Sequence, residues 1–199
     1  MEYIILIITA VFVNNIVLAQ FLGMCPFLGV SKKVETAASM GMAVLFVMLI
    51  STLVTYPIYY GILVPFKLQF MQTVVYILVI AALVQMVEII LKKSMPALYA
   101  ALGVFLPLIT TNCTILGVAI NVINFEYDLG HSAVYAIATA LGFTLSLVLF
   151  AGIREQTAIT KTPKGMEGTP IALLTAGLLA MAFMGFSGVD KGLSAALGL

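Results

Sequence analysis

The sequence predicts an all-α integral membrane protein whose six transmembrane helices form two three-helix inverted repeats. Of its 199 residues, 63% are apolar and only 9% are charged, whereas about a quarter of the residues in ordinary soluble domains carry a charge. Six stretches without a charged residue are each long enough for a helix to cross a hydrocarbon core, which takes about 20 residues. Because lipid leaves exposed backbone groups unsatisfied, helices are the structure expected for such runs.

The six expected spans are joined by short connections, so no large soluble domain separates them. They cover residues 3–31, 36–66, 68–87, 94–125, 132–153 and 168–189. The N-terminus lacks the basic stretch and cleavage site of a signal peptide, so the first span is expected to remain in the protein. No glycine-rich phosphate or dinucleotide motif occurs, and nucleotide or flavin chemistry is therefore expected from other chains. A formal net charge of +1 without a basic stripe argues against a nucleic-acid partner.

Basic residues are distributed unevenly between the two ends of the expected spans. One face receives Lys32, Lys33, Lys92, Lys93, Arg154, Lys161 and Lys164, and the other receives only Lys67 and Lys191. Short cytoplasmic loops carry an excess of lysine and arginine. The first face is therefore expected to be cytoplasmic, and both termini are expected outside the cytoplasm.

The two halves, residues 1–93 and 94–199, each contain three expected spans, so the second half enters from the opposite side of the membrane. A matching motif supports this inverted repeat. Cys25 begins Cys-Pro-Phe-Leu-Gly-Val, and Cys113 begins Cys-Thr-Ile-Leu-Gly-Val. Chance agreement at three fixed offsets from a cysteine is rare, so an internal repeat is preferred. These are the only two cysteines of the chain.

The first and fourth expected spans contain residues that disturb a simple helix. The first carries Asn14, Asn15, Gly23, Pro26 and Gly29, and the fourth carries Gly103, Pro107, Thr110, Thr111, Asn112 and Gly117. Proline removes a backbone donor and kinks a helix, and irregular backbone at membrane depth survives only where protein or water buries it. We expect two broken helices whose polar side chains satisfy the freed backbone groups. Ordinary close packing of small residues is the alternative, favoured for Ala138, Gly142 and Ser146 on the fifth span.

Cys25 and Cys113 are the candidate metal and cofactor ligands. Thiolates bind soft metals, and an iron–sulfur cluster typically needs four of them. This chain supplies two, so a homologous chain in the opposite orientation is the economical source of the others. Two alternatives remain: a disulfide between the two cysteines, which the intramembrane setting disfavours, and inert buried thiols.

Charged residues near the cytoplasmic ends of the spans have two interpretations each. Glu88 precedes Lys92 by four residues, which favours a helix-end ion pair, although intramembrane acids also serve in ion conduction. Arg154 and Glu155 are expected to anchor the end of the fifth span or to bind a soluble protein of the same complex.

The outer loop between the fourth and fifth spans holds His131 beside Glu126 and Asp128. Three such side chains could bind a metal, but a solvated loop is the favoured interpretation. Three tyrosines near the outer end of the second span indicate an interfacial aromatic belt. They are Tyr56, Tyr59 and Tyr60.

Several longer motifs resemble one family of membrane proteins. They are FLGMCPFLGVSKK at residues 21–33, LGVFLPLITTNC at residues 102–113, and the shorter runs at 13–15, 175–178 and 183–188. The family includes the A subunit of the bacterial Rnf complex and the E subunit of the sodium-translocating NADH:quinone oxidoreductase. The resemblance extends over essentially the whole chain.

This resemblance implies a non-catalytic membrane subunit of a translocase in the bacterial inner membrane, which couples electron flow between ferredoxin and NAD to Na⁺ or H⁺ transport. In the family, a [2Fe-2S] cluster within the membrane is shared with a homologous, oppositely oriented protein, the E subunit of Rnf. Cys25 and Cys113 match the ligand positions. Soluble iron–sulfur and flavin subunits would deliver and accept the electrons.

Two other functions stay open at this point. The first is the corresponding subunit of the sodium-translocating NADH:quinone oxidoreductase. The pair Asn14-Asn15 and the Thr-Thr-Asn-Cys run at residues 110–113 look more like the ferredoxin-linked complex than this quinone-linked relative. A cofactor-free secondary transporter is the rival from another class, because inverted repeats fit it equally well. Its substrate site would consist of Asn14, Asn15, Thr110, Thr111 and Asn112.

Overall fold

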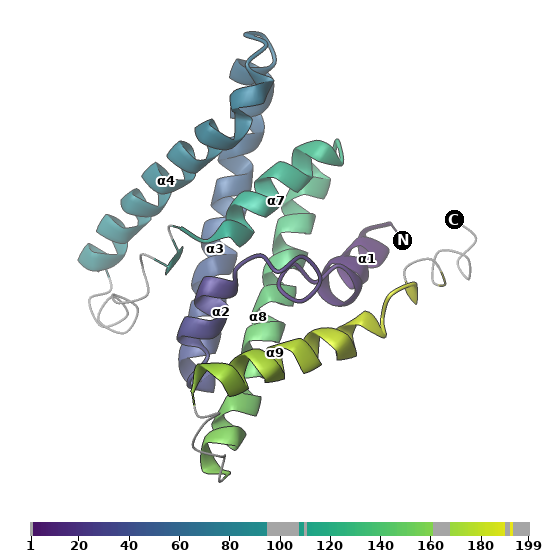
Figure 1. Ribbon diagram of the computed structural model, residues 1–199. Helices are drawn as coiled ribbons and strands as arrows, with labels where there is room; N and C mark the ends of the chain where they lie inside the picture. Colours follow the sequence, from purple (N-terminus) through teal and green to yellow (C-terminus); the bar gives the residue numbers. More distant parts are fainter. Residues whose placement is uncertain (1, 95–107, 110, 161–167, 190–191, 193–199) are drawn as a thin grey trace. The chain divides into compact units, whose positions relative to one another are not determined.

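The computed structural model describes residues 2–94, 108–109, 111–160, 168–189 and 192, and every regular element among them is helical (Figure 1). This agrees with the predicted all-α class. The α-helices are α1 (Glu2–Ile8), α2 (Met24–Val30), α3 (Val34–Ile58), α4 (Gln72–Ser94), α7 (Cys113–Asn124), α8 (Leu129–Ile159) and α9 (Thr169–Met184). Two π-helical turns, η1 (Thr9–Val13) and η2 (Tyr59–Leu63), and a 3₁₀ turn, η3 (Gln69–Met71), complete the set.

Three of the described helical segments are long and apolar enough to cross a membrane. They are Val34–Leu63, Gln69–Ile90 and Leu129–Ile159, with 30, 22 and 31 residues. They coincide with the second, third and fifth expected spans. Helix α9 falls within the sixth expected span, and its 16 residues correspond to about 24 Å at 1.5 Å per residue.

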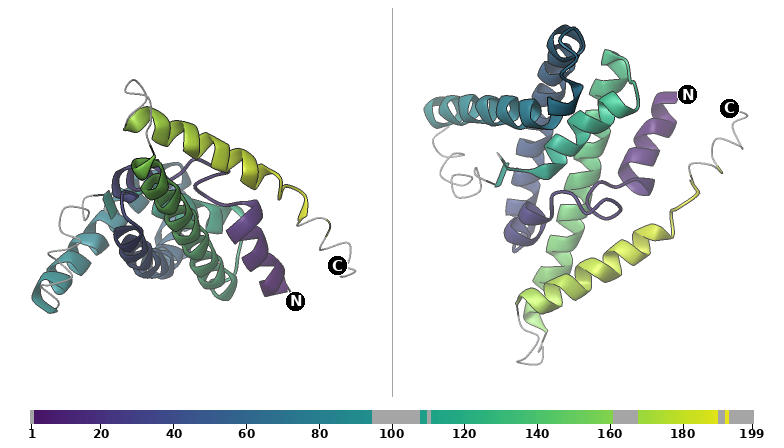
Figure 2. Two further views of the ribbon diagram at one scale, coloured as in Figure 1. Left: turned by 90° about the horizontal axis from the view of Figure 1, so that it is seen from below. Right: turned by 45° about the horizontal axis from the view of Figure 1, so that its top comes forward.

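The first expected span is interrupted rather than continuous. Helix α1 and the turn η1 end at Val13, residues 14–23 are not helical, and α2 then begins at Met24. The interruption forms the purple loop before α2 in Figures 1 and 2. Pro26 does not cause it, because it lies in the first turn of α2, where a missing backbone N–H costs no hydrogen bond.

Only the second part of the fourth expected span is described. Helix α7 begins at Cys113, immediately after Asn112. Several residues used in the predictions above lie outside the described part of the chain. They are Gly103, Pro107 and Thr110 of the second motif region, and the basic residues Lys161, Lys164 and Lys191.

The chain forms two compact units, and each has its own apolar core. The first consists of Met1–Met42 with Ala138–Leu199, and the second of Ala43–Ile137. In the first unit, Phe27, Phe143 and Phe150 are fully buried. In the second, α4 contacts α7, and the core includes Tyr76, Met48 and Ile115. The expected division into residues 1–93 and 94–199 stays a prediction.

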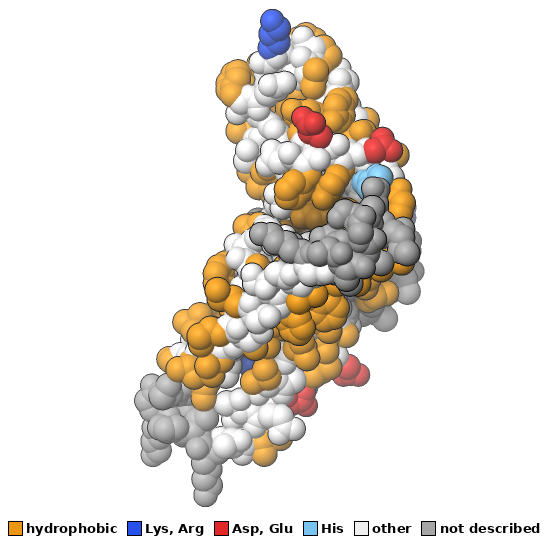
Figure 3. Space-filling view, turned by 90° about the vertical axis from the view of Figure 1, so that its right-hand side faces the viewer, with side chains coloured by type: hydrophobic (Ala, Val, Ile, Leu, Met, Phe, Trp, Pro, Cys, Tyr) orange, Lys and Arg blue, Asp and Glu red, His pale blue; other side chains and the backbone are white. Residues whose placement is uncertain are grey.

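Large apolar side chains also cover the outside of the helices. Leu78 of α4 is 68% exposed and Met181 of α9 is 61% exposed. Figure 3 shows hydrophobic side chains over much of one face, with charged side chains sparse among them. Such a surface is suited to contact with lipid rather than water.

The small residues spaced by four on α8 form a packing face, as expected. Ala138, Gly142 and Ser146 are all buried. A Cβ on Gly142 would lie 3.1 Å from the Cα of Val11 and 3.2 Å from the carbonyl oxygen of Ala10. The glycine therefore lets the backbone at the end of the first helical segment approach α8 closely.

Candidate functional site

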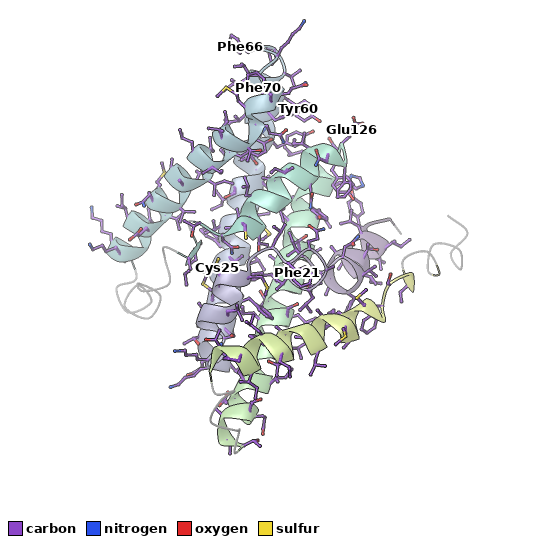
Figure 4. All side chains as sticks on the ribbon, in the orientation of Figure 1. Phe21, Cys25, Tyr60, Phe66, Phe70 and Glu126 are labelled. Atoms are coloured by element: carbon purple, nitrogen blue, oxygen red, sulfur yellow. The ribbon has the colours of Figure 1, made fainter. Side chains whose placement is uncertain are left out.

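Each cysteine stands at the start of a helix that follows irregular backbone. Cys25 is the second residue of α2, after Gly23 with φ 79°, and Cys113 is the first residue of α7. Cys25 is exposed and Cys113 is half-buried, and neither forms a disulfide among the described residues. Cys25 belongs to the first unit and Cys113 to the second. In Figure 4, Cys25 is labelled at the start of α2.

The two matching motifs have the same local structure. In each, the cysteine is the first or second residue of an α-helix, and the third and sixth motif residues are buried. These residues are Phe27 and Val30 in the first motif, and Ile115 and Val118 in the second. Residues three apart lie on one face of a helix, so each motif buries one face and leaves its cysteine less buried. This agreement over six residues supports the internal repeat at the local level.

The amide of Asn15 organises the break in the first expected span. Its Oδ1 accepts hydrogen bonds from the backbone N–H groups of Val17 and Leu18, at 3.2 and 3.4 Å. Its Nδ2 donates to the carbonyl oxygens of Val11 and Gly142, at 3.0 and 2.9 Å. Asn15 is 1% exposed, and all four hydrogen-bonding positions of its amide are used. The expectation that polar side chains satisfy freed backbone groups is thus confirmed here.

The break also holds strained backbone close to the first cysteine. Phe21 has a φ of 55°, a left-handed conformation that is unusual for a bulky residue. It is 62% exposed and lies four residues before Cys25 (Figure 4). Asn14, in contrast to its neighbour Asn15, is exposed.

Asn112 caps the helix that Cys113 begins. Its Oδ1 accepts a hydrogen bond of 3.0 Å from the backbone N–H of Thr114, the usual interaction of an N-cap residue. Two polar atoms beside Cys113 have no hydrogen-bond partner among the described residues: Nδ2 of Asn112 and Oγ1 of Thr114. Both residues are buried, with 4% and 0% exposure. Buried polar atoms are rarely left in this state without a functional reason or an additional bound group.

The C-terminal end of α2 is held by Arg154 of α8. The Nη1 of Arg154 donates to the carbonyl oxygen of Leu28 and to Oγ of Ser31, both at 2.8 Å. The ring of Phe150 stacks on Phe27 with a centroid distance of 4.2 Å. Sequence reasoning expected Arg154 to anchor α8 or to bind a soluble partner, and missed its contact with the helix of Cys25. The only signal was a lone arginine at the end of an apolar span.

The residues at and after the connection between α7 and α8 form an aromatic cluster. The rings of Tyr127 and His131 stack at 6.3 Å, and Tyr127 also lies 5.6 Å from Tyr135. Burial raises the pKa of Tyr127, and the neighbouring Tyr135 raises it further. Within the described residues, no three histidine, cysteine or acidic side chains are grouped so that they could hold a metal ion. His131, Glu126 and Asp128 are thus not gathered into a three-ligand group in this part of the chain, and the favoured interpretation of a solvated loop stays a prediction.

The remaining candidates keep their places on the helices. Glu88 lies in α4 one turn before Lys92, as the ion-pair interpretation requires, and it is half-exposed. The three tyrosines at the end of α3 and in η2 contact one another. The Tyr56 and Tyr60 rings are 4.9 Å apart, and the Tyr59 and Tyr60 rings are 5.3 Å apart.

A comparison with protein families identifies the chain. The family model described as Rnf-Nqr subunit, membrane protein, matches residues 3–190. The chain belongs to the Rnf-Nqr family. The resemblance inferred from the motifs is confirmed, and so is the expectation of a membrane protein.

Three Rnf-Nqr relatives show how far the similarity extends. The A subunit of the Na⁺-translocating ferredoxin:NAD⁺ oxidoreductase complex of Acetobacterium woodii is 58% identical, over 96% of this chain and 100% of its own length. The A subunit of the ion-translocating oxidoreductase complex of Syntrophotalea carbinolica is 57% identical, over 94% and 97%. That of Actinobacillus pleuropneumoniae is 52% identical, over 96% and 98%. All three relatives are thus named as the same component of an ion-translocating oxidoreductase complex.

Proposed function

We propose that this chain is the A subunit of an Rnf-type complex, in which electron flow between ferredoxin and NAD is coupled to transport of Na⁺ or H⁺. The observation that carries the proposal is 58% identity over the full length of a relative named for this activity. The chain contributes to the translocase as a membrane subunit and is not catalytic alone. Its setting is the bacterial inner membrane, with both termini outside the cytoplasm.

We propose further that Cys25 and Cys113 ligate an intramembrane [2Fe-2S] cluster shared with a homologous, oppositely oriented subunit. An iron–sulfur cluster typically requires four thiolates, and this chain has two cysteines in motifs with the same local structure. The Cys113 thiol lies at the start of the 12-residue helix α7, where backbone N–H groups favour a negatively charged group. Soluble iron–sulfur and flavin subunits exchange electrons with this cluster.

The residues around Cys113 fit such a group. Oγ1 of Thr114 and Nδ2 of Asn112 are buried donors without a partner among the described residues, and hydrogen bonds to cluster sulfurs tune the reduction potential. When bound, the cluster would supply a one-electron carrier inside the membrane. The residues of this chain bind and orient it: two cysteines ligate, Asn15 secures the backbone before α2, and Asn112 caps α7.

The rival secondary transporter loses part of its site. Its substrate would bind the polar side chains of the two broken spans, but the Asn15 amide already makes four hydrogen bonds to the protein. Oδ1 of Asn112 is likewise occupied by the N–H of Thr114. The whole Asn15 amide and the Oδ1 of Asn112 therefore hold the backbone instead of a solute. The quinone-linked function is disfavoured by the name of the Acetobacterium woodii relative, which specifies ferredoxin and NAD⁺.

The test compares the purified complex carrying Cys25→Ala or Cys113→Ala with the native complex. We expect each variant to lose one [2Fe-2S] signal in electron paramagnetic resonance spectra, two iron atoms per complex, and ferredoxin-driven ion uptake. Met42→Ala serves as the control, because this exposed sulfur-containing side chain lies on the outside of α3 and has no ligand role. Full iron content and uptake in either cysteine variant would refute the ligand assignment.

A further inference from the structure

We propose that Arg154 is a positioning residue for Cys25: it holds the C-terminal end of α2 and so determines where the thiol at the other end is presented. The proposal rests on the ligand role of Cys25 proposed above. All the residues involved belong to the first compact unit.

Helix α2 cannot hold its own position. It has seven residues, which is about 10 Å at 1.5 Å per residue, and isolated helices of this length are marginal. The last carbonyl groups of a helix lack partners within it. Arg154 supplies a donor to one of them, the Leu28 carbonyl, and a second hydrogen bond to Ser31, which directly follows the helix.

Side-chain packing reinforces the same attachment. Phe27 and Phe150 are both fully buried, and their rings are nearly parallel, with an interplanar angle of 12°. The guanidinium carbon of Arg154 lies 5.7 Å from the centroid of the Phe150 ring, within the range of cation–π attraction. Phe150 and Arg154 are one turn apart on α8, so one face of α8 contacts α2 through both an aromatic and a charged side chain.

The second motif does not need such a residue. Helix α7 continues to Asn124 and has 12 residues, so the Leu116 carbonyl, the counterpart of Leu28, lies within the helix. Carbonyl groups there accept hydrogen bonds from the amide four residues later. The counterpart of Ser31 is Ala119, which has no side-chain acceptor. Arg154 thus gives the Leu28 carbonyl of α2 a hydrogen-bond donor, whereas in α7 the next helical turn gives one to the Leu116 carbonyl.

The charge of Arg154 suits this position. Among the residues that the structure describes, Arg154 forms no ion pair, and its nearest polar partners are the neutral groups of Leu28 and Ser31. A positive charge at the C-terminal end of a helix is favourable. Lysine would keep the charge but not the planar fork that reaches two acceptors. Comparing the native chain with Arg154→Lys therefore separates the effect of the arginine geometry from that of the positive charge.

The test measures hydrogen exchange of α2 and the properties of the cluster in the intact complex. In Arg154→Ala we expect the backbone amides of α2 to exchange at least about tenfold faster, because local opening becomes easier. Those of α7 should be unchanged. At unchanged iron content, the spectrum and midpoint potential of the cluster should shift. Arg154→Lys should bring both quantities part of the way back to their native values. The exposed residue Gln156, two positions along α8, gives the control Gln156→Ala, which should leave both quantities native.

Three results would overturn the proposal. The first is native exchange of α2 in Arg154→Ala. The second is faster exchange with a native cluster spectrum and potential, which would make Arg154 a merely structural residue. If Arg154→Ala fails to assemble, Ser31→Ala takes its place, since it removes one acceptor only. We expect an increase in exchange of about threefold, and native exchange there is the third refuting result.

The same measurements separate this proposal from the proposed function. A native complex without a [2Fe-2S] signal would refute the ligand role of Cys25, and with it any positioning role. Native cluster signals together with unchanged α2 exchange in Arg154→Ala would refute the positioning role alone.

Discussion

The Nδ2 of Asn15 donates a hydrogen bond of 2.9 Å to the carbonyl oxygen of Gly142, which is 127 positions away in the sequence. The hydroxyl of Ser146 donates to the same carbonyl, also at 2.9 Å. The break in the first expected span is thus attached to the small-residue face of α8. Because α2 and Cys25 follow this break, the attachment limits where the first cysteine motif can lie.

Replacing Asn15 by alanine should destabilise the protein strongly. The change leaves the buried N–H groups of Val17 and Leu18 without their acceptor, and each unsatisfied group costs about 1–3 kcal/mol. We expect the free energy of unfolding to fall by about 2–4 kcal/mol, measured by reversible unfolding of the full-length chain in mixed micelles. Asn14→Ala is the matched control, since Asn14 is exposed and its loss should change stability by less than about 0.5 kcal/mol. Equal effects of the two variants would contradict the role of Asn15.

Gly142→Ala tests the close approach of η1 and α8. The new Cβ would lie 3.1 Å from the backbone of Val11, so one segment must move, and such overpacking typically costs about 1–3 kcal/mol. A Cβ added to Gly152 on the same helix would have no described atom within 4 Å apart from its own chain neighbours and the backbone of α8. Gly152→Ala should therefore be neutral or stabilising by up to about 1 kcal/mol, owing to the higher helix propensity of alanine. A neutral Gly142→Ala in the same unfolding assay would argue against the contact.

Thr114→Val should change the cluster more than the fold. The Oγ1 of Thr114 has no partner among the described residues, so its removal should leave stability unchanged or slightly raised. If this hydroxyl donates to a cluster sulfur, its loss should lower the midpoint potential, because such hydrogen bonds stabilise the more negative reduced state. Redox titration of the complex measures the shift. Thr52→Val is the control: Thr52 is equally buried, but its hydroxyl bonds to the Met48 carbonyl within α3, and the potential should stay native.

Tyr127 should contribute to stability only below strongly alkaline pH. Burial, followed by the neighbouring Tyr135, raises the pKa of Tyr127 above the usual value of 10.0, so the folded state favours the neutral phenol. Its contribution is therefore fully present below about pH 10 and is lost as the pH rises through the higher folded pKa. Phenolate absorbance during titration of the native chain and of Tyr127→Phe measures this difference. A Tyr127 phenol that ionises at or below its usual pH would contradict it.

Hydropathy determines the long helices of this protein. The segments Val34–Leu63, Gln69–Ile90 and Leu129–Ile159 follow from uninterrupted apolar runs, since a run of that length in lipid has to satisfy its own backbone. The motif around each cysteine was also evident without a structure. The motif residues lie within six consecutive positions, and on one helix the buried face repeats every three to four residues. The buried positions of the motif therefore follow from spacing alone.

The positions of the breaks and their attachments were not accessible in this way. Pro26 marked the region of the first break in the sequence, but it lies inside α2, because the first turn of a helix tolerates proline. The exact interruption depends on Asn15, whose amide finds its partners only when Gly142 lies beside it.

The sequence by itself therefore determined an all-helical membrane protein of the Rnf-Nqr family with two matching cysteine motifs. Hydrophobic periodicity and motif matches depend on residues that are close together in the sequence. The membrane helices and the two cysteine motifs can both be recognised from such residues. Only the tertiary structure decided which distant groups secure the first motif, because contacts such as Arg154 with Leu28 join residues 126 positions apart. No local pattern encodes such a pair, since it forms only when two separate helices pack against each other.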